Sequence, residues 1–253
     1  MVNQKKERSA LIIIGNEILS GRTLDKNTQS IAEKMSEHGV PLSEVRIVPD
    51  IEVEIIAAVN ALRAKYDYVF TTGGIGPTHD DITAACIAKA FEAEFGTHAQ
   101  AYDILLDFYG EENLTQARAT MAKMPIYDDM ELIRNPVSAA PGFRIENVFV
   151  MAGVPKIMNA MLDHVVEMIT PGEPLHSRTL MISAPESEIA AILSALQDSY
   201  PNIDIGSYPQ YKDGHWGVSA VLRGVDIPML EAAREVLAKK LVAIGIDVQS
   251  VKV

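Results

Sequence analysis

Residues 71–83 read TTGGIGPTHDDIT and decide the fold. They follow a short β-rich run at 68–71 and precede a stretch with helical apolar spacing that continues to about residue 95. A strand that enters a helix through a glycine-rich turn is typical of a parallel α/β sheet. Because glycine lets the backbone approach an anion closely, we expect Gly73, Gly74 and Gly76 to cradle a phosphate.

The acidic end of the same turn admits two interpretations. Thr78 stands three residues before Asp81 and can form a capping box with it at the start of the helix. Alternatively, Asp80 and Asp81 hold a divalent cation beside the phosphate, because two carboxylates would otherwise repel an anionic ligand. A weaker reading of the two acids is that they only favour the positive end of the helix dipole. We predict a metal site at Asp80 and Asp81.

The pattern around the turn predicts a mainly parallel sheet between two layers of helices. Short apolar runs alternate with helical periodicity through the first half of the chain, which is typical of a three-layer α/β/α fold. The expected strands are 10–14, 45–48, 68–71, 132–133, 143–145 and 148–151. The expected helices are 27–38, 53–62, 82–95, 102–109, 116–124 and 156–169.

A second, smaller domain is predicted after residues 170–174, TPGEP, where two prolines and a glycine interrupt the pattern. We therefore divide the chain into domains 1–170 and 175–253. The second domain has a β-α-β-β-α-β order, typical of a ferredoxin-like α+β layer. Its expected elements are strand 178–183, helix 187–199, strand 203–207, a turn at 212–214, strand 216–222, helix 228–244 and strand 247–252.

Three further polar segments follow expected strands. The loop 15–28 carries Glu17 and Asn27, which are ligand candidates unless the loop is simply solvated and Asn27 caps a helix. Asp50 ends the second strand and is either catalytic or a helix cap. In the segment 135–142, NPVSAAPG, the ligand candidates are Ser138, Pro141 and Gly142, with a plain turn as the alternative.

The amino-acid composition limits the kinds of molecule that the protein is expected to bind. A net charge of −12 argues against binding to nucleic acid, which needs clustered Lys and Arg. The single cysteine, Cys86, excludes an internal disulfide, and we expect it to be buried. The six histidines show no zinc spacing. The apolar run 10–14 is too short to span a membrane, so we expect a cytoplasmic protein without a membrane partner.

Four spaced motifs, IGNEILSG, IVPD, TTGGIGPTHDDIT and NPVSAAPG, resemble the molybdopterin-binding domain family, and within it the competence-damage-inducible branch. The resemblance spans residues 10–169, and the region after 174 looks like the small appended domain of that branch. It implies a pocket for molybdopterin or a nucleotide and a homo-oligomer. In the adenylylating branch, the functional aspartates match Asp50 and Asp81.

The same resemblance implies two rival functions. The competence-damage branch looks like a pyrophosphatase on ADP-ribose-type or FAD-type nucleotides that depends on Mg²⁺, Mn²⁺ or Co²⁺, and Asp81 and Asp50 are then catalytic. The alternative is a protein that binds molybdopterin or a nucleotide without turnover. Two departures favour this alternative, because the usual GTAPG reads SAAPG at 138–142 and the usual LPGVP reads MAGVP at 151–155.

Overall fold

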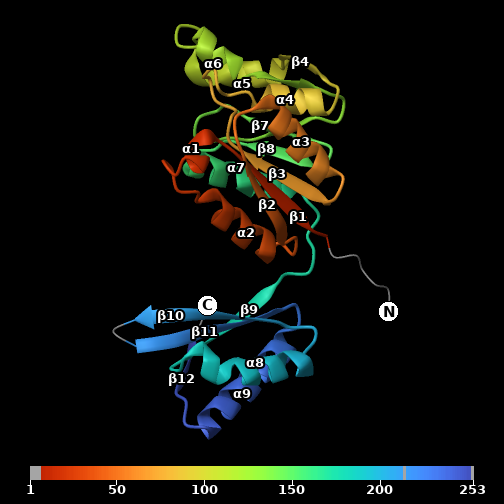
Figure 1. Ribbon diagram of the computed structural model, residues 1–253. Coiled ribbons are helices and arrows are strands. Elements are labelled where there is room, and N and C mark those ends of the chain that lie inside the picture. Colours follow the sequence, from red (N-terminus) through yellow and green to blue (C-terminus); the bar gives the residue numbers. More distant parts are fainter. Residues whose placement is uncertain (1–6, 213–214, 252–253) are drawn as a thin grey trace. The chain divides into compact units, whose positions relative to one another are not determined.

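The computed structural model describes residues 7–212 and 215–251, and the chain divides into two compact units (Figure 1). The first unit is Met1–Gly172 and the second is Glu173–Val253. The division falls inside the segment 170–174. Each unit has its own hydrophobic core.

A six-stranded sheet forms the centre of the first unit, with strand order β2-β1-β3-β8-β7-β6. The four strands β2, β1, β3 and β8 run parallel, and β7 pairs antiparallel with β8 on one side and with β6 on the other. Their bounds are β1 Ser9–Ile14, β2 Leu42–Val48, β3 Tyr68–Thr72, β6 Glu131–Ile133, β7 Gly142–Ile145 and β8 Val148–Met151. All six residues of β1 are buried because it lies inside the sheet and is covered on both faces.

Helices cover both faces of this sheet (Figure 1). Alternate residues of β1 point to opposite faces, so Leu11 packs with the buried residues of α2 and α7, and Ile12 packs with those of α3 and α4. The helices are α1 Asn16–Leu19, α2 Asn27–Glu37, α3 Glu52–Arg63, α4 Thr83–Ala90, α5 Ala99–Tyr109, α6 Gln116–Thr120 and α7 Pro155–Met168. The predicted three-layer α/β/α fold is confirmed. Cys86 is buried as expected, and burial raises the pKa of its thiol to about 11.

Two helix predictions were too long. The helix expected over 82–95 ends at Ala90, and the helix expected over 116–124 ends at Thr120. Glu92 adopts a positive φ of 52° and turns the chain. The residues that follow form β4, Glu94–Thr97, which pairs antiparallel with β5, Lys123–Ile126. This pairing joins segments about thirty residues apart, and it overrides the local helical spacing.

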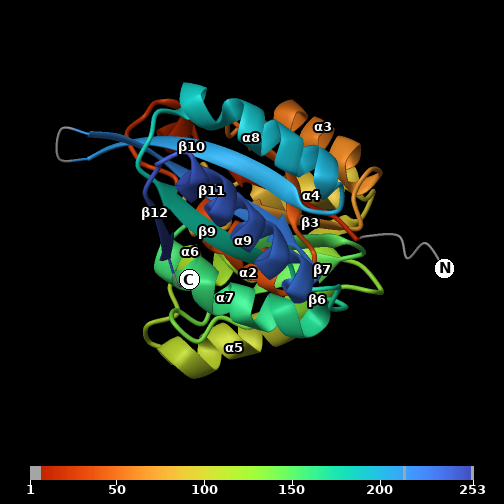
Figure 2. The same ribbon diagram turned by 90° about the horizontal axis from the view of Figure 1, so that it is seen from below.

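The second unit has the predicted β-α-β-β-α-β order. Its elements are β9 His176–Ile182, α8 Glu186–Ser199, β10 Asp204–Lys212, β11 His215–Gly224, α9 Ile227–Ala243 and β12 Val248–Val251. The four strands are antiparallel in the order β10-β11-β9-β12, and α8 and α9 cover one face of this sheet (Figure 2). The smaller α+β layer is therefore confirmed. The tip of the turn predicted at 212–214, and the last residue of the strand predicted at 247–252, lie outside the described residues.

Within the described ranges, no helix is both long and apolar enough to cross a membrane.

Candidate functional site

The glycine-rich turn leaves β3 at the carboxyl edge of the parallel strands. Gly73 and Gly74 have φ angles of 104° and 67°, a region that residues with a Cβ atom rarely adopt. A Cβ atom at Gly73 would lie 2.1 Å from the carbonyl oxygen of Ile14, and one at Gly74 would lie 2.2 Å from Oγ1 of Thr83. The chain's own packing therefore requires both glycines, whether or not a ligand binds.

The backbone amides available to an anion begin one residue later than predicted. The amide of Gly73 donates to the carbonyl of Met151 at 3.2 Å. The amides of Gly74, Ile75 and Gly76 donate to no protein acceptor among the residues that the structure describes. Successive unpaired amides in a turn can bind an anion where their N–H groups converge. The cradle is thus 74–76.

Asp81 lies against this cradle. Its Oδ2 accepts a hydrogen bond from the Thr78 amide at 2.8 Å and a shorter one from the Thr78 hydroxyl. The bond to the amide is half of the predicted capping box, but α4 begins only at Thr83, so Thr78 does not cap it. The Thr78 hydroxyl also lies close enough to Asp80 to lower the pKa of that carboxyl, helped by its own backbone amide and by the charge of His79.

Buried polar atoms without partners surround the turn. Thr71, Thr72 and Thr83 have buried hydroxyl oxygens that meet no hydrogen-bond partner in the described part of the chain, and the same holds for Oδ1 of Asn27. Thr83 is fully buried and Asn27 is 6% exposed. Buried polar groups in folded proteins normally have partners, so these oxygens indicate places that water or a ligand completes.

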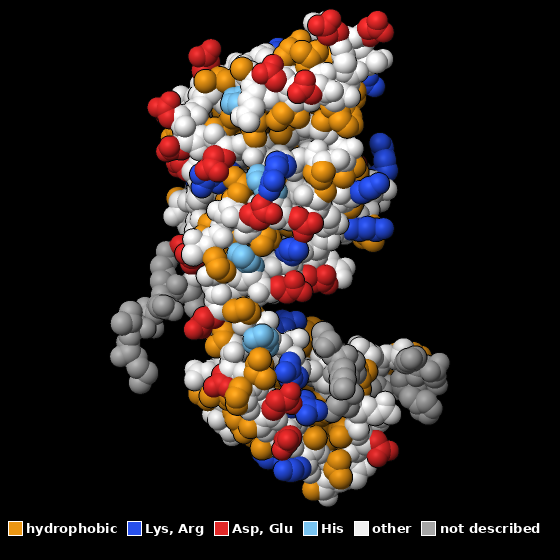
Figure 3. All heavy atoms as spheres, turned by 180° about the vertical axis from the view of Figure 1, so that it is seen from behind, with side chains coloured by type: hydrophobic (Ala, Val, Ile, Leu, Met, Phe, Trp, Pro, Cys, Tyr) orange, Lys and Arg blue, Asp and Glu red, His pale blue; other side chains and the backbone are white. Residues whose placement is uncertain are grey.

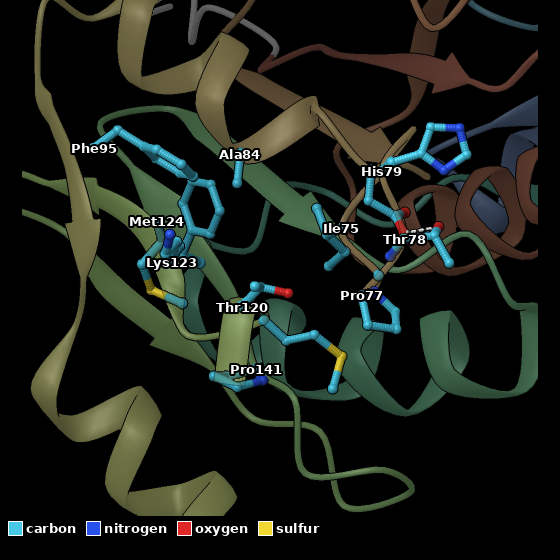
Figure 4. A pocket seen from close by; sticks show the side chains of 14 residues that line it. Ile75, Pro77, Thr78, His79, Ala84, Phe95, Thr120, Lys123, Met124 and Pro141 are labelled. Carbon is cyan, nitrogen blue, oxygen red and sulfur yellow. Dashed lines mark hydrogen bonds between the residues drawn. The ribbon is translucent and has the colours of Figure 1, made fainter. Parts of the chain in front are cut away.

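A cavity of about 370 Å³ opens beside Gly76 (Figure 4). Figure 4 shows Phe95, Lys123 and Met124 on one side of it and Pro77 and Thr78 on the other, while the His79 ring points away. The remaining lining residues are Ile75, Gly76, His79, Asp81, Ala84, Thr120, Met121, Pro141 and Phe143. The cavity is therefore mostly apolar, with Thr78, Asp81, Thr120 and Lys123 as polar groups at its wall.

The candidates from the other loops lie at the same sheet edge but outside this cavity lining. Asp50 accepts a hydrogen bond from the amide of Asn16 at 2.8 Å and so joins the loops after β1 and β2. Glu17 is exposed and folds back beside Gly15. Asn27 donates through Nδ2 to the carbonyl of Gly153 at 2.8 Å. These residues connect the loops that surround the turn, and none of them lines the cavity beside Gly76.

The proline and glycine loop contributes one of its three candidates. Pro141 lines the cavity. Ser138 Oγ instead accepts a hydrogen bond from Asn135, whose Oδ1 accepts one from the Ser138 amide. A Cβ atom at Gly142 would lie 2.3 Å from the carbonyl of Val150, which gives that glycine a packing role. Sequence reasoning missed Asn135, which organises the loop, although its place just before a proline in a turn is a known signal.

It also missed the cavity wall formed by Phe95, Thr120, Met121, Lys123 and Met124. These residues lie in or beside β4 and β5, and the wrong helix predictions concealed them. No group of three or more His, Cys, Asp or Glu side chains with metal-site geometry occurs among the described residues. A cation at this site would therefore depend on one or two carboxylates together with oxygens of the ligand.

The fold and the motifs define the class of this protein. Residues 10–171 match the family model described as probable molybdopterin binding domain, and the chain belongs to that family. Residues 174–249 match the model described as FAD synthase, middle domain. Within the family, the chain is a relative of the CinA proteins, as their sequences and one solved structure show.

Three similar proteins illustrate how the chain is related to this family. The crystal structure of CinA from Thermoplasma acidophilum, whose function is described as unknown, is 33% identical with a TM-score of 0.60, covering 64% of this chain and 97% of that one. A CinA-like protein of Geobacter metallireducens is 32% identical over 81% of this chain and 52% of its own length. A probable FAD synthase of Caenorhabditis elegans is 29% identical over 94% of this chain. The chain spans about half the length of the last two.

Proposed function

We propose that the first unit binds a nucleotide or pterin diphosphate and hydrolyses its pyrophosphate, with ADP-ribose-type or FAD-type nucleotides as substrates. The observation that carries this proposal is the row of unpaired amides at 74–76, beside a cavity that also contains the Asp81 carboxylate. The names of the relatives support a nucleotide-related role, because FAD is itself a dinucleotide with a pyrophosphate.

The two parts of the ligand would bind in different surroundings, the phosphates at polar groups and the ring at an apolar wall. The phosphates accept hydrogen bonds from the amides of the cradle, and an aromatic ring lies against the apolar wall that includes Phe95 and Phe143. Acidic and basic side chains are mixed over the face of the first unit seen in Figure 3. The net charge of −12 also provides no broad positive field, so an anion depends on local amides and on Lys123.

The residues present fit a divalent cation of the Mg²⁺, Mn²⁺ or Co²⁺ type. Asp81 Oδ1 has no hydrogen-bond partner within the described residues, and the Asp80 side chain is 66% exposed. The Asp80 carboxylate is anionic at neutral pH, as any aspartate with an ordinary or lowered pKa is. When bound, such a cation neutralises charge that develops on the phosphoryl oxygens. Thr78 holds Asp81 against Gly76 for this purpose.

The decisive experiment measures release of AMP from ADP-ribose and FAD with each of the three cations. Asp81→Asn keeps an oxygen for the Thr78 contacts but loses the charge, and we expect a fall in kcat of at least about 100-fold. Gly76→Ala places a methyl group 2.7 Å from Asp81 Oδ2 and should also reduce turnover without unfolding the protein, because Gly76 does not have a positive φ.

The matched control is Asp103→Asn, which changes an exposed carboxylate outside the cavity lining. It should leave turnover unchanged. Full activity of Asp81→Asn would contradict the proposed catalytic role.

A second candidate is ligand binding without turnover. It is favoured by the commitment of Asp81 Oδ2 to Thr78 and by Ala139, which stands where the resemblance to the family implies a threonine hydroxyl. Calorimetry with FAD, ADP-ribose and a pterin would distinguish the two functions. Tight binding with no product under any of the three cations supports the second candidate, and release of a mononucleotide excludes it.

A further inference from the structure

A second cavity, of about 860 Å³, lies on the other side of the loop 135–142. Its walls come from the start of α5, from β6, from that loop and from α7. It shares only Pro141 with the cavity beside Gly76. Its size falls within the range of small-molecule sites. Neither the glycine-rich turn nor Asp80 or Asp81 takes part in it.

Two histidines in this wall have tautomers that the structure fixes. The Nδ1 of His98 accepts a hydrogen bond from the amide of Ala101 at 3.4 Å, and the Nδ1 of His164 accepts one from the amide of Arg134 at 3.1 Å. A neutral ring whose Nδ1 accepts must carry its proton on Nε2. Burial, assisted by the charge of Arg134, lowers the pKa of His164 and keeps this ring neutral at pH 7. Each ring therefore has an Nε2–H donor.

The rest of the polar lining also offers donors. The guanidinium of Arg134 pairs with Glu167 in an exposed ion pair, which contributes little and exchanges readily. Gln100 is exposed at the first turn of α5 and adds an amide group. Two of the acceptors are engaged, since Oε1 of Glu131 pairs with Arg144, and Oδ1 of Asn135 receives two backbone amides.

The remaining surface is apolar. Ile104 lies one turn along α5 from Gln100, and Met130 and Leu132 come from the segment that enters and forms β6. A molecule that suits this cavity combines an apolar body with a group that accepts several hydrogen bonds.

We propose that this cavity is a second ligand site, which binds a small organic anion with a carboxylate or phosphate group on an apolar or aromatic body. The anionic group contacts His98, His164 and Arg134, and the body packs against Ile104, Met130 and Leu132. The site is separate from the diphosphate site and does not depend on hydrolysis there.

The test uses the histidine side-chain signals of the full, ¹⁵N-labelled chain in proton–nitrogen NMR spectra. His98 and His164 report the second cavity, while His79, whose exposed ring points away from the first cavity, serves as a reference signal outside the second. His→Gln variants assign the signals. The probes are benzoate and AMP, with benzamide and adenosine as uncharged partners of similar shape. We expect both anions to shift the His98 and His164 signals saturably and the uncharged partners to leave them in place.

Two variants complete the test. Arg134→Gln should weaken benzoate binding at least about fivefold, as the loss of one charge-assisted hydrogen bond requires. Met130→Trp should abolish it by filling the cavity. The matched control, Arg223→Gln in the second unit, should leave binding unchanged. Circular dichroism melting curves show that each variant is folded.

Three results would overturn the proposal. One is an equal response to benzoate and benzamide, and another is unchanged benzoate affinity in Arg134→Gln. The third is an AMP titration that leaves the His98 and His164 signals in place, which would exclude the phosphate from the second cavity. Benzoate and AMP also separate the carboxylate from the phosphate as the preferred group.

Discussion

The cavity beside Gly76 lies between two loops that are built in opposite ways. The turn after β3 leaves the amides of 74–76 unpaired, and its glycines are required by close contacts with Ile14 and Thr83. The loop 135–142 satisfies its own backbone instead. Asn135 is 8% exposed and makes four hydrogen bonds within that loop, two from its Nδ2 and two to its Oδ1.

The difference teaches which loop is built for recognition. Unpaired amides at a sheet edge can bind an anion without any rearrangement. A loop whose amides are already bound to a buried side chain can only act as a rigid wall. The four predictions below test this contrast, and Trp216, the only tryptophan, reports the second unit separately in each unfolding experiment.

The largest effect is expected from Gly73→Ala. The new methyl group would meet a backbone oxygen at 2.1 Å in a residue with a φ of 104°, so we expect a loss of about 3 kcal/mol or more in the free energy of unfolding. Urea unfolding followed by circular dichroism measures it. The control is Gly110→Ala, where φ is 73° but nothing lies within 4 Å, and the cost should be about 1 kcal/mol. Equal losses in the two variants would show that the contact with Ile14 is unimportant.

Asn135→Ala should have the next largest effect. It leaves the amides of Val137 and Ser138 and the carbonyl of Ala140 without their partner, and we expect a loss of about 2–3 kcal/mol. Urea unfolding again measures the change. Asn113→Ala, at an exposed position, should stay within about 0.5 kcal/mol of the unmodified chain. A loss as small as that of the control would mean that the loop does not need its buried asparagine.

Ala139→Gly should stabilise the same loop. Ala139 has a positive φ of 62°, a conformation that glycine adopts without strain, and we expect a gain of about 0.5 kcal/mol in the free energy of unfolding. The same substitution at Ala57, in the exposed middle of α3, should cost about 1 kcal/mol. Thermal melting of both variants gives the comparison. Destabilisation by Ala139→Gly would show that the positive φ of Ala139 does not strain the backbone.

The smallest effect is expected on the pH dependence of stability, through the hydrogen bond between Arg134 and His164. The amide of Arg134 donates to His164, and burial lowers the pKa of that ring. A lowered pKa in the folded state favours the neutral form, so this contribution to stability is complete above pH 6.5 and is lost as pH falls through the folded pKa. The melting temperature should therefore fall less steeply on acidification in His164→Gln. His79→Gln, at a side chain that is 99% exposed, should keep the original slope.

Much of the fold could be predicted because its signals are local. The buried run at 10–14, the helical spacing of α2 and α3, and the proline-rich boundary at 170–174 each depend on neighbouring residues. The order of strands in the second unit followed from the same patterns. The helix predictions were wrong over 91–95 and 121–124. The strand pairing there joins distant parts of the chain, and no periodicity within either segment reveals the partner.

The candidate site could be predicted only where its residues belong to local sequence motifs. The glycine-rich turn supplied Gly76, Thr78 and Asp81 as candidates and the segment 135–142 supplied Pro141, and all four line the cavity. Spacing along the chain did not show that Gly73 already donates its amide to Met151. Nor did it show that Asp50 lies outside the lining of this cavity and binds the amide of Asn16.

The sequence by itself determined the two units, the place of the glycine-rich turn and the succession of strands and helices apart from β4 and β5. These features depend on hydrophobic periodicity and on backbone freedom, which are properties of adjacent residues. Tertiary structure alone decided which amides remain unpaired, which carboxylate lies beside them and which aromatic side chains form the wall. The physical reason is that these features depend on hydrogen bonds and packing contacts between residues that are far apart in the sequence. Such contacts exist only in the folded chain.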